Sequence, residues 1–227
     1  MSTATASVSA RKRAAILDSA RETFLRKGFT NANLDDIAAL ASVSKMTIYS
    51  HFGSKDELFR QVIEAIITQR SAAGPPLDAA IPADELAVSL RAIAADIVRT
   101  VRHPDVVGIR RVLIAEQPRH PALAAKWRGS TVLATITELA DHFRALQERR
   151  LLIAGDPKTL ATHFLWMLIG DSLDAGLLDP AEPPTRPPAD VADEVVRTFL
   201  CAYGDRHNSS RGTGRKGGDD DDPSRRN

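Results

Sequence analysis

The sequence predicts an all-helical protein, and three observations support this prediction. Apolar residues recur three or four positions apart over long stretches, as on one face of a helix. Alternation with a period of two is not sustained anywhere, and the Asn-Gly and Asp-Gly pairs of tight hairpins are missing from the sequence. Prolines gather at a few points that separate the helical stretches.

Composition divides the 227-residue chain into two helical domains with polar ends. We expect a disordered N-terminal arm at 1–9, a first domain at 10–70, a linker at 71–83 around Gly74-Pro-Pro76, a larger domain at 84–204 and a disordered tail at 205–227. The 43% hydrophobic and 26% charged residues are typical of a soluble globular protein.

Charge, cysteine content and apolar run length limit the possible functions. The formal net charge is only +1, but residues 1–60 hold nine Lys and Arg against six Asp and Glu, so a nucleic-acid site would be local. Cys201 is the single cysteine, which excludes an intramolecular disulfide and a cysteine-based metal cluster. The apolar runs, such as 164–170, are too short to span a membrane, and no signal peptide is visible. We therefore expect a cytoplasmic protein without a membrane partner.

The first domain begins with an amphipathic helix predicted over residues 10–26. Its apolar stripe consists of Ile16, Leu17, Ala20 and Phe24. Gly28 follows the helix and can adopt a positive φ, so we expect the helix to end there and Phe29 to fold back onto the stripe.

Three helix starts follow within residues 30–58, which is the most informative segment. Asn33 and Ser44 are suited to cap two short helices, and Ser54 with Glu57 forms the pattern of a capping box for a third. Ala38, the turn at Ser42-Val43 and Ile48 have the spacing of a helix-turn-helix unit. Its core is predicted to consist of Ile37, Ala41, Val43, Ile48 and Phe52.

In such a unit the second helix, from Lys45 to His51, enters the major groove of DNA. Its exposed side chains suit this purpose: Lys45 can neutralise a phosphate or bind guanine, and Thr47 and Tyr49 can donate to phosphate oxygens or touch a thymine methyl. The N-terminus capped by Ser44 can bind a phosphate through its backbone N–H groups. Lys55, a cation in the first turn of its helix, fits if a phosphate docks at the same place. The alternative at each position is an ordinary surface or core side chain.

Residues 11–66 closely resemble the N-terminal domain of the TetR family of transcriptional regulators. The most specific stretches are Leu34-Asp-Asp-Ile-Ala38 and Val43-Ser-Lys-Met-Thr-Ile-Tyr-Ser-His-Phe-Gly-Ser-Lys-Asp-Glu-Leu58. The resemblance implies phosphate contacts by Thr30, Asn33, Thr47, Tyr49, His51 and Lys55, with Lys45, Met46 and Ser50 nearest the bases. At the turn, Ser42 stands where the family usually has glycine. A left-handed conformation there would cost serine roughly 1 kcal/mol relative to glycine, unless the turn has another geometry.

The resemblance further implies that residues 84–204 form a helical effector-binding and dimerisation domain. Two apolar stripes on the helix near 158–178 indicate two partners, the protomer core and a second subunit; the alternative is a helix fully buried in the monomer. The predicted dimer interface contains Leu165, Ile169, Leu173, Val195 and Phe199. The candidate pocket residues, which could equally be core, are Glu116, Trp127, His142, Phe143, His163, Phe164, Trp166 and Met167.

Catalytic and cofactor motifs are missing from the sequence, so we predict no enzyme, no cofactor and no metal site. The histidines are dispersed, without H-E-x-x-H or an i, i+4 pair, and no P-loop or G-x-S-x-G is present. We therefore predict a homodimeric repressor that is released from a pseudo-palindromic operator in double-stranded DNA by a small-molecule effector. The alternative is an activator, or a regulator controlled by a protein partner.

Overall fold

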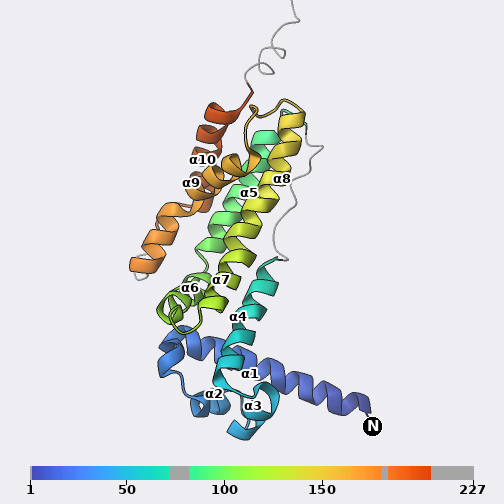
Figure 1. Cartoon of the computed structure of the whole chain (residues 1–227), viewed down its shortest axis with the longest axis vertical. Coiled ribbons are helices and arrows are strands. Elements are labelled where there is room, and N and C mark those ends of the chain that lie inside the picture. Colours follow the sequence, from blue (N-terminus) through green and yellow to red (C-terminus); the bar gives the residue numbers. More distant parts are fainter. Residues whose placement is uncertain (1, 72–81, 180–183, 206–227) are drawn as a thin grey trace, which may run out of the picture.

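The computed structural model describes residues 2–71, 82–179 and 184–205, and it is a two-part assembly of helices (Figure 1). Within this part of the chain, β-type pairing is limited to an isolated antiparallel bridge between Leu152 and Gly204. The elements are α1 (Ser2–Asn31), α2 (Leu34–Leu40), α3 (Lys45–Phe52), α4 (Lys55–Ser71), α5 (Leu86–Val101), α6 (Pro104–Glu116), α7 (Pro121–Arg128), the π-helical turn η1 (Gly129–Leu133), α8 (Ala134–Glu148), α9 (Pro157–Leu178) and α10 (Pro188–Tyr203).

The predicted helices are present, with one clear difference at the N-terminus. Helix α1 begins at Ser2, so residues 2–9, which we expected to be a disordered arm, are helical. Gly28 has φ 73° and breaks α1 where the sequence predicted its end, although helical turns continue to Asn31. Phe29 folds back as expected and its ring lies 4.9 Å from that of Phe59. Most of the predicted linker (72–81) and tail (206–227) lies outside the described residues.

Two hydrophobic cores hold the helices together, and their boundary is not the one that the sequence suggested. The C-terminal core is formed by α5, α8, α9 and α10 and contains Leu90, Phe143, Phe164 and Phe199. The second core, which we call the shared core, contains residues of α1 to α4 such as Phe24, Phe59 and Ile63, together with residues of α6 and α7. Helices α6 and α7 belong by sequence to the larger domain, yet by packing they complete the core of the first one.

Contacts between α1 and α6 show how closely the two parts are joined. A Cβ on Gly108 of α6 would come within 2.9 Å of Leu25 Cδ2, so glycine permits the close approach of the two helices. Beside this contact, Arg21 of α1 forms an ion pair with Asp105 in the first turn of α6. In the described part of the chain, no helix has the length and apolar character needed to cross a membrane.

Candidate nucleic-acid interface

Helices α2 and α3 form the predicted helix-turn-helix unit at the lower end of the molecule (Figure 1). The buried side chains of Ile37, Ile48 and Phe52 hold the two helices together. At the turn, the N–H of Val43 donates to the carbonyl of Ala38 at 3.0 Å, and the Ala38 side chain is buried. Ser42 has φ 53°, so the turn uses the left-handed conformation and serine bears the strain that glycine would avoid.

Side-chain caps fix the starts of the three helices. The side chain of Asn33 accepts from the N–H of Asp35, and that of Ser44 accepts from the N–H of Thr47, as predicted. Ser54 accepts from the N–H of Glu57 at 3.1 Å, but Glu57 does not return the bond. Its carboxylate instead accepts from Arg60 and Gln61, so the capping box is half formed. These bonds to Arg60 and Gln61 lower the pKa of Glu57 to about 2.

The outer face of α3 presents side chains that suit DNA. Met46 is 74% exposed and Tyr49 is 42% exposed, although large apolar and aromatic side chains are usually covered in a folded protein. Lys45 and Ser50 are exposed beside them, and His51 is half-buried next to Phe52. Neither Met46 nor Tyr49 serves the core, so the packing of this chain leaves them free for a partner.

Lys45 is held in place by an ion pair between the two helices of the unit. Its Nζ lies 2.9 Å from Oδ2 of Asp35 in the first turn of α2. The hydrogen bond and the charge of Asp35 raise the pKa of Lys45, which therefore stays cationic. To contact a phosphate or guanine, Lys45 must leave Asp35, so this carboxylate competes with DNA.

Lys55 lies at the other side of the unit, in the first turn of α4. Its Nζ donates to the carbonyl oxygen of Thr30 at 3.3 Å and lies 4.6 Å from the centre of the Phe29 ring. Partial burial lowers the pKa of Lys55. A half-buried cation near a helix N-terminus gains from an anion at the same place, which is the arrangement that a phosphate contact needs.

Thr30, which is predicted to contact a phosphate, is hydrogen-bonded within the protein. Its hydroxyl donates to Oε1 of Glu116 at 2.9 Å, and its oxygen accepts from Nη1 of Arg119 at 3.3 Å. Glu116 is only 7% exposed, and a buried carboxylate is costly unless a donor forms a hydrogen bond to it. Thr30 is thus bound to α6 in this structure. Glu116 is a predicted pocket residue, and its bond to Thr30 could not be anticipated because the two residues lie 86 positions apart in the chain.

The loop between α6 and α7 and the start of α7 make further contacts with the first domain. The His120 ring packs edge-on against Phe29, with the ring centres 5.0 Å apart, and its Nε2 lies 3.5 Å from Oδ1 of Asp56. Lys126 of α7 forms an ion pair with Glu64 of α4. A shift of α7 would therefore be transmitted directly to α4.

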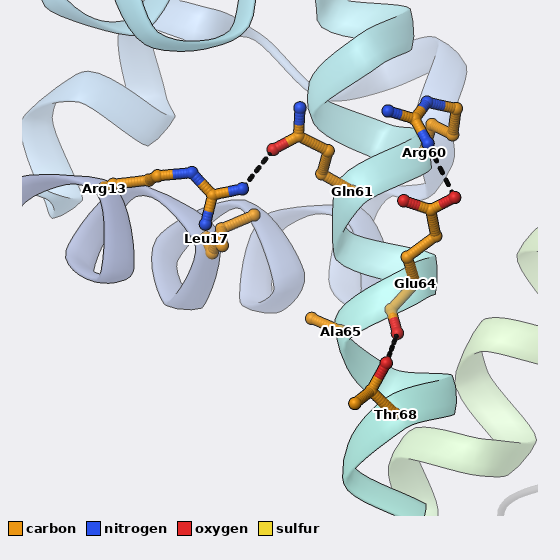
Figure 2. Close-up of a pocket in the computed structure, with 7 residues that line it drawn as sticks. All are labelled: Arg13, Leu17, Arg60, Gln61, Glu64, Ala65 and Thr68. Carbon is orange, nitrogen blue, oxygen red and sulfur yellow. Dashed lines mark hydrogen bonds and ion pairs between the residues drawn. The ribbon is translucent and has the colours of Figure 1, made fainter. Parts of the chain in front are cut away.

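A groove of about 540 Å³ lies between α1 and α4 (Figure 2). Charged groups on its walls are paired within the protein: Arg60 contacts Glu64, and Arg13 donates to Oε1 of Gln61 at 2.5 Å. None of the predicted pocket residues lines this groove. Its lining consists of Arg13, Leu17, Arg60, Gln61, Glu64, Ala65 and Thr68.

The residues predicted to line an effector pocket do not come together at one place. Phe143 and Phe164 are fully buried and pack edge-on against each other, and both contact the Phe199 ring in the C-terminal core. Trp127 lies in the shared core, where its Nε1 is buried without a hydrogen-bond partner among the described residues. The remaining members lie toward the surface: His163 is exposed and bonds Tyr203, Trp166 and Met167 are exposed, and His142 is half-buried.

The predicted dimer-interface residues face the inside of the protomer. Leu165, Ile169 and Phe199 are at most 2% exposed, Val195 is 9% exposed, and Leu173 packs against the same C-terminal core. A side chain that its own protomer already encloses has no surface left for a second one, so the assignment is corrected for the four buried side chains, whereas Leu173 is only half-buried. The alternative of burial in the monomer core holds for these side chains. The exposed large apolar side chains of α9 are instead Trp166, Met167 and, at its last residue, Leu178.

Comparisons with known proteins agree with this architecture. Residues 16–62 match the family model of bacterial regulatory proteins of the tetR family, and residues 88–205 match the C-terminal domain of AefR-like transcriptional repressors. The transcriptional repressor NicS of Pseudomonas putida is 35% identical over 117 residues, which are 51% of this chain and 52% of NicS. The match thus spans about half the length of this curated relative.

Solved structures match over nearly their whole length. A TetR-family regulator from Mesorhizobium loti superimposes with a TM-score of 0.68 at 28% identity, covering 86% of this chain and 98% of the other. The flavonoid-responsive regulator FrrA gives a TM-score of 0.69 at 28% identity, covering 87% and 99%. With the helix-turn-helix geometry and both family models in agreement, this chain belongs to the TetR family of DNA-binding transcriptional regulators.

Proposed function

We propose that this chain is a homodimeric repressor that a small-molecule effector releases from its operator. The observation that carries the proposal is the outer face of α3, where Lys45, Met46, Tyr49 and Ser50 are exposed together beside the capped N-terminus of the helix. In a dimer, two α3 helices would occupy successive major grooves about 34 Å apart on a pseudo-palindromic site. The base-reading role falls to Lys45, Met46 and Ser50, and the phosphate contacts to Asn33, Ser44, Thr47, Tyr49, His51 and Lys55.

The outer face of α9 supports a homodimer. Trp166 is 47% exposed and Met167 is 39% exposed on this face, which is unfavourable for an isolated protomer. Gly170 lies one turn further on, and a Cβ there would meet no atom within 4 Å. Two large apolar side chains beside an open glycine suit the close approach of a second α9.

Effector control is best supported at α7. Trp127 is buried, and its indole N–H lacks an acceptor among the described residues, so a ligand oxygen there would satisfy an otherwise costly donor. The same helix contacts α4 through Lys126 and Glu64. An effector that binds one position of α7 more tightly than another would thereby shift α4 and the two α3 helices relative to the groove spacing.

Fluorescence anisotropy on the DNA upstream of the protein's own gene tests operator binding. We expect salt-sensitive binding of two protomers per site, tighter than on scrambled DNA. Tyr49→Ala should weaken it at least tenfold with unchanged helicity, and Tyr49→Phe separates the hydroxyl from the ring. Equal affinity of Tyr49→Ala and wild type would contradict the assignment of this face.

Sedimentation tests the dimer, and the control is the same kind of substitution at another exposed apolar side chain. Trp166→Glu should give monomers with weak operator affinity, because a charge would be buried at the interface. Val88→Glu changes an apolar side chain that is 62% exposed on α5 and should leave the dimer intact. Dimers of Trp166→Glu would place the interface elsewhere.

Fluorescence can also report on the effector site, since the chain has only two tryptophans. In Trp166→Phe, emission comes from Trp127 alone. A compound that releases the operator should change that emission, and Trp127→Phe should shift its apparent Kd. Release without any change in Trp127 emission would argue against an effector at α7.

A further inference from the structure

Helix α1 extends well beyond the part that packs against the protein. Among its described side chains, which begin at Val8, the first that is fully buried is Ile16, and those of residues 8–14 are all exposed. Figure 1 shows this end of α1 projecting from the molecule at the same end as α2 and α3. The stretch from Ser2 to Ala15 would be about 20 Å long at 1.5 Å per residue. We call residues 2–15 the α1 arm.

The α1 arm is purely basic. Arg11, Lys12 and Arg13 are its charged residues, and no acidic residue occurs in the chain before Asp18. Within the described residues, neither Arg11 nor Lys12 forms an ion pair or side-chain hydrogen bond. Most other exposed cations of the first domain have an acidic neighbour, as Lys27 has Asp36 and Lys45 has Asp35. The positive charge of the arm is thus left uncompensated by the fold.

Arg13 fixes the base of the arm against the helix-turn-helix unit. Its guanidinium donates to Gln61 of α4 (Figure 2) and lies 5.5 Å from the centre of the Phe52 ring, at the end of α3. Phe52 follows His51, which is a proposed phosphate contact. The base of the arm therefore lies against the end of α3, and Lys12 and Arg11 directly precede Arg13 in the chain.

We propose that the α1 arm binds the sugar–phosphate backbone of operator DNA outside the base pairs under α3, with Arg11 and Lys12 as its phosphate ligands. The inference rests on the proposed placement of α3 in the major groove. At 3.4 Å per base pair, an arm of this length reaches about six base pairs. Because phosphate contacts carry no direct sequence information, the arm contributes affinity and leaves base specificity to α3.

The composition of the arm favours DNA over a lipid surface. A helix that lies in a membrane interface presents Trp, Phe or Leu opposite its cations. In residues 2–14 of this chain, Val8 is the bulkiest apolar residue. The arm offers charge without an apolar face, as a contact with a polyanion requires.

The test compares the full-length double variant Arg11→Ala/Lys12→Ala with wild type in operator titrations at several salt concentrations. Each lost phosphate contact reduces the slope of log K against log salt by about 0.9, so the slope should become shallower by about two per protomer. The preference for operator over scrambled DNA should stay unchanged. The matched control Lys158→Ala/Arg197→Ala removes two exposed cations from α9 and α10 and should keep the wild-type slope.

Shortening the DNA provides a second readout. Removing the base pairs that flank the two half-sites should weaken wild type and should leave Arg11→Ala/Lys12→Ala unaffected. If wild type binds the operator as expected and the arm variant has the same salt slope as wild type, the inference about the arm is overturned and the placement of α3 still stands. If wild type itself bound operator and scrambled DNA equally and without salt dependence, the placement of α3 would be wrong, and the proposal that the arm binds DNA would be refuted as well.

Discussion

Replacing Thr30 by Val removes one hydroxyl and preserves the shape of the side chain. In the structure this hydroxyl donates to the buried carboxylate of Glu116 at 2.9 Å, between α1 and α6. A hydrogen bond to a charged group contributes about 1.5–3 kcal/mol to stability. Arg119 lies 4.0 Å from the other carboxylate oxygen and is 65% exposed, so it cannot replace the lost donor. We expect Thr30→Val to lower the free energy of unfolding by about 2 kcal/mol, or Tm by roughly 4–8 °C.

Urea unfolding of four proteins measures this bond: wild type, Thr30→Val, Glu116→Leu and the double variant. If the hydroxyl and the carboxylate act on each other, the Thr30 substitution should matter little once Glu116 is Leu, and the cycle should give a coupling energy of about 1–3 kcal/mol. Thr30→Ser keeps the hydroxyl and is the control. It should retain most of the stability of wild type.

The opposite role for Thr30, a phosphate contact, makes a different prediction. In that case Thr30→Val would unfold like wild type and would bind the operator more weakly at every salt concentration tested. That pair of results would refute the reasoning from the Glu116 bond. It would also indicate that the hydroxyl contributes to DNA binding.

Three other substitutions follow from the geometry. Asp35→Asn should tighten operator binding severalfold in anisotropy titrations, because it frees Lys45 and removes a negative charge beside DNA; weaker binding would contradict this. Ser42→Gly should raise the unfolding free energy by about 0.5–1 kcal/mol in urea, since relief of left-handed strain (about 1–2 kcal/mol) exceeds the entropic cost of glycine (about 0.5–1 kcal/mol). Wild type should lose stability as the pH falls from 4.5 to about 2, because Glu57 is protonated at a higher pH in the unfolded chain than in the folded one, where Arg60 donates to its carboxylate. Glu57→Gln should flatten that part of the curve of unfolding free energy against pH. Parallel curves for the two proteins would count against the Arg60 contact.

Local features of the first domain could be predicted from the sequence. The caps at Asn33 and Ser44, the positive φ at Gly28 and the buried faces at Ile37 and Ile48 depend on residues within one or two turns of each other. Short-range hydrogen bonds and apolar periodicity are sufficient to specify them. The strained turn at Ser42 was visible only as a departure from the family pattern.

Features that depend on distant parts of the chain could not be predicted. Helix α9 is apolar almost all round, so periodicity could not show that Leu165 and Ile169 face inward while Trp166 and Met167 face outward. The Thr30–Glu116 bond joins residues that lie 86 positions apart. Only the packing of α6 against α1 reveals it.

The shared core also limits how this protein can be recombined with its relatives. Its helices are not contiguous in sequence, because α5 belongs to the C-terminal core and lies between α4 and α6. A chimera joined within residues 72–81 would keep α1 to α4 and take α6 and α7 from another protein, whose side chains would have to fit around Phe59 and accept the bond from Thr30. Exchange of the DNA-reading head therefore requires that the contact surfaces of α6 and α7 be exchanged with it.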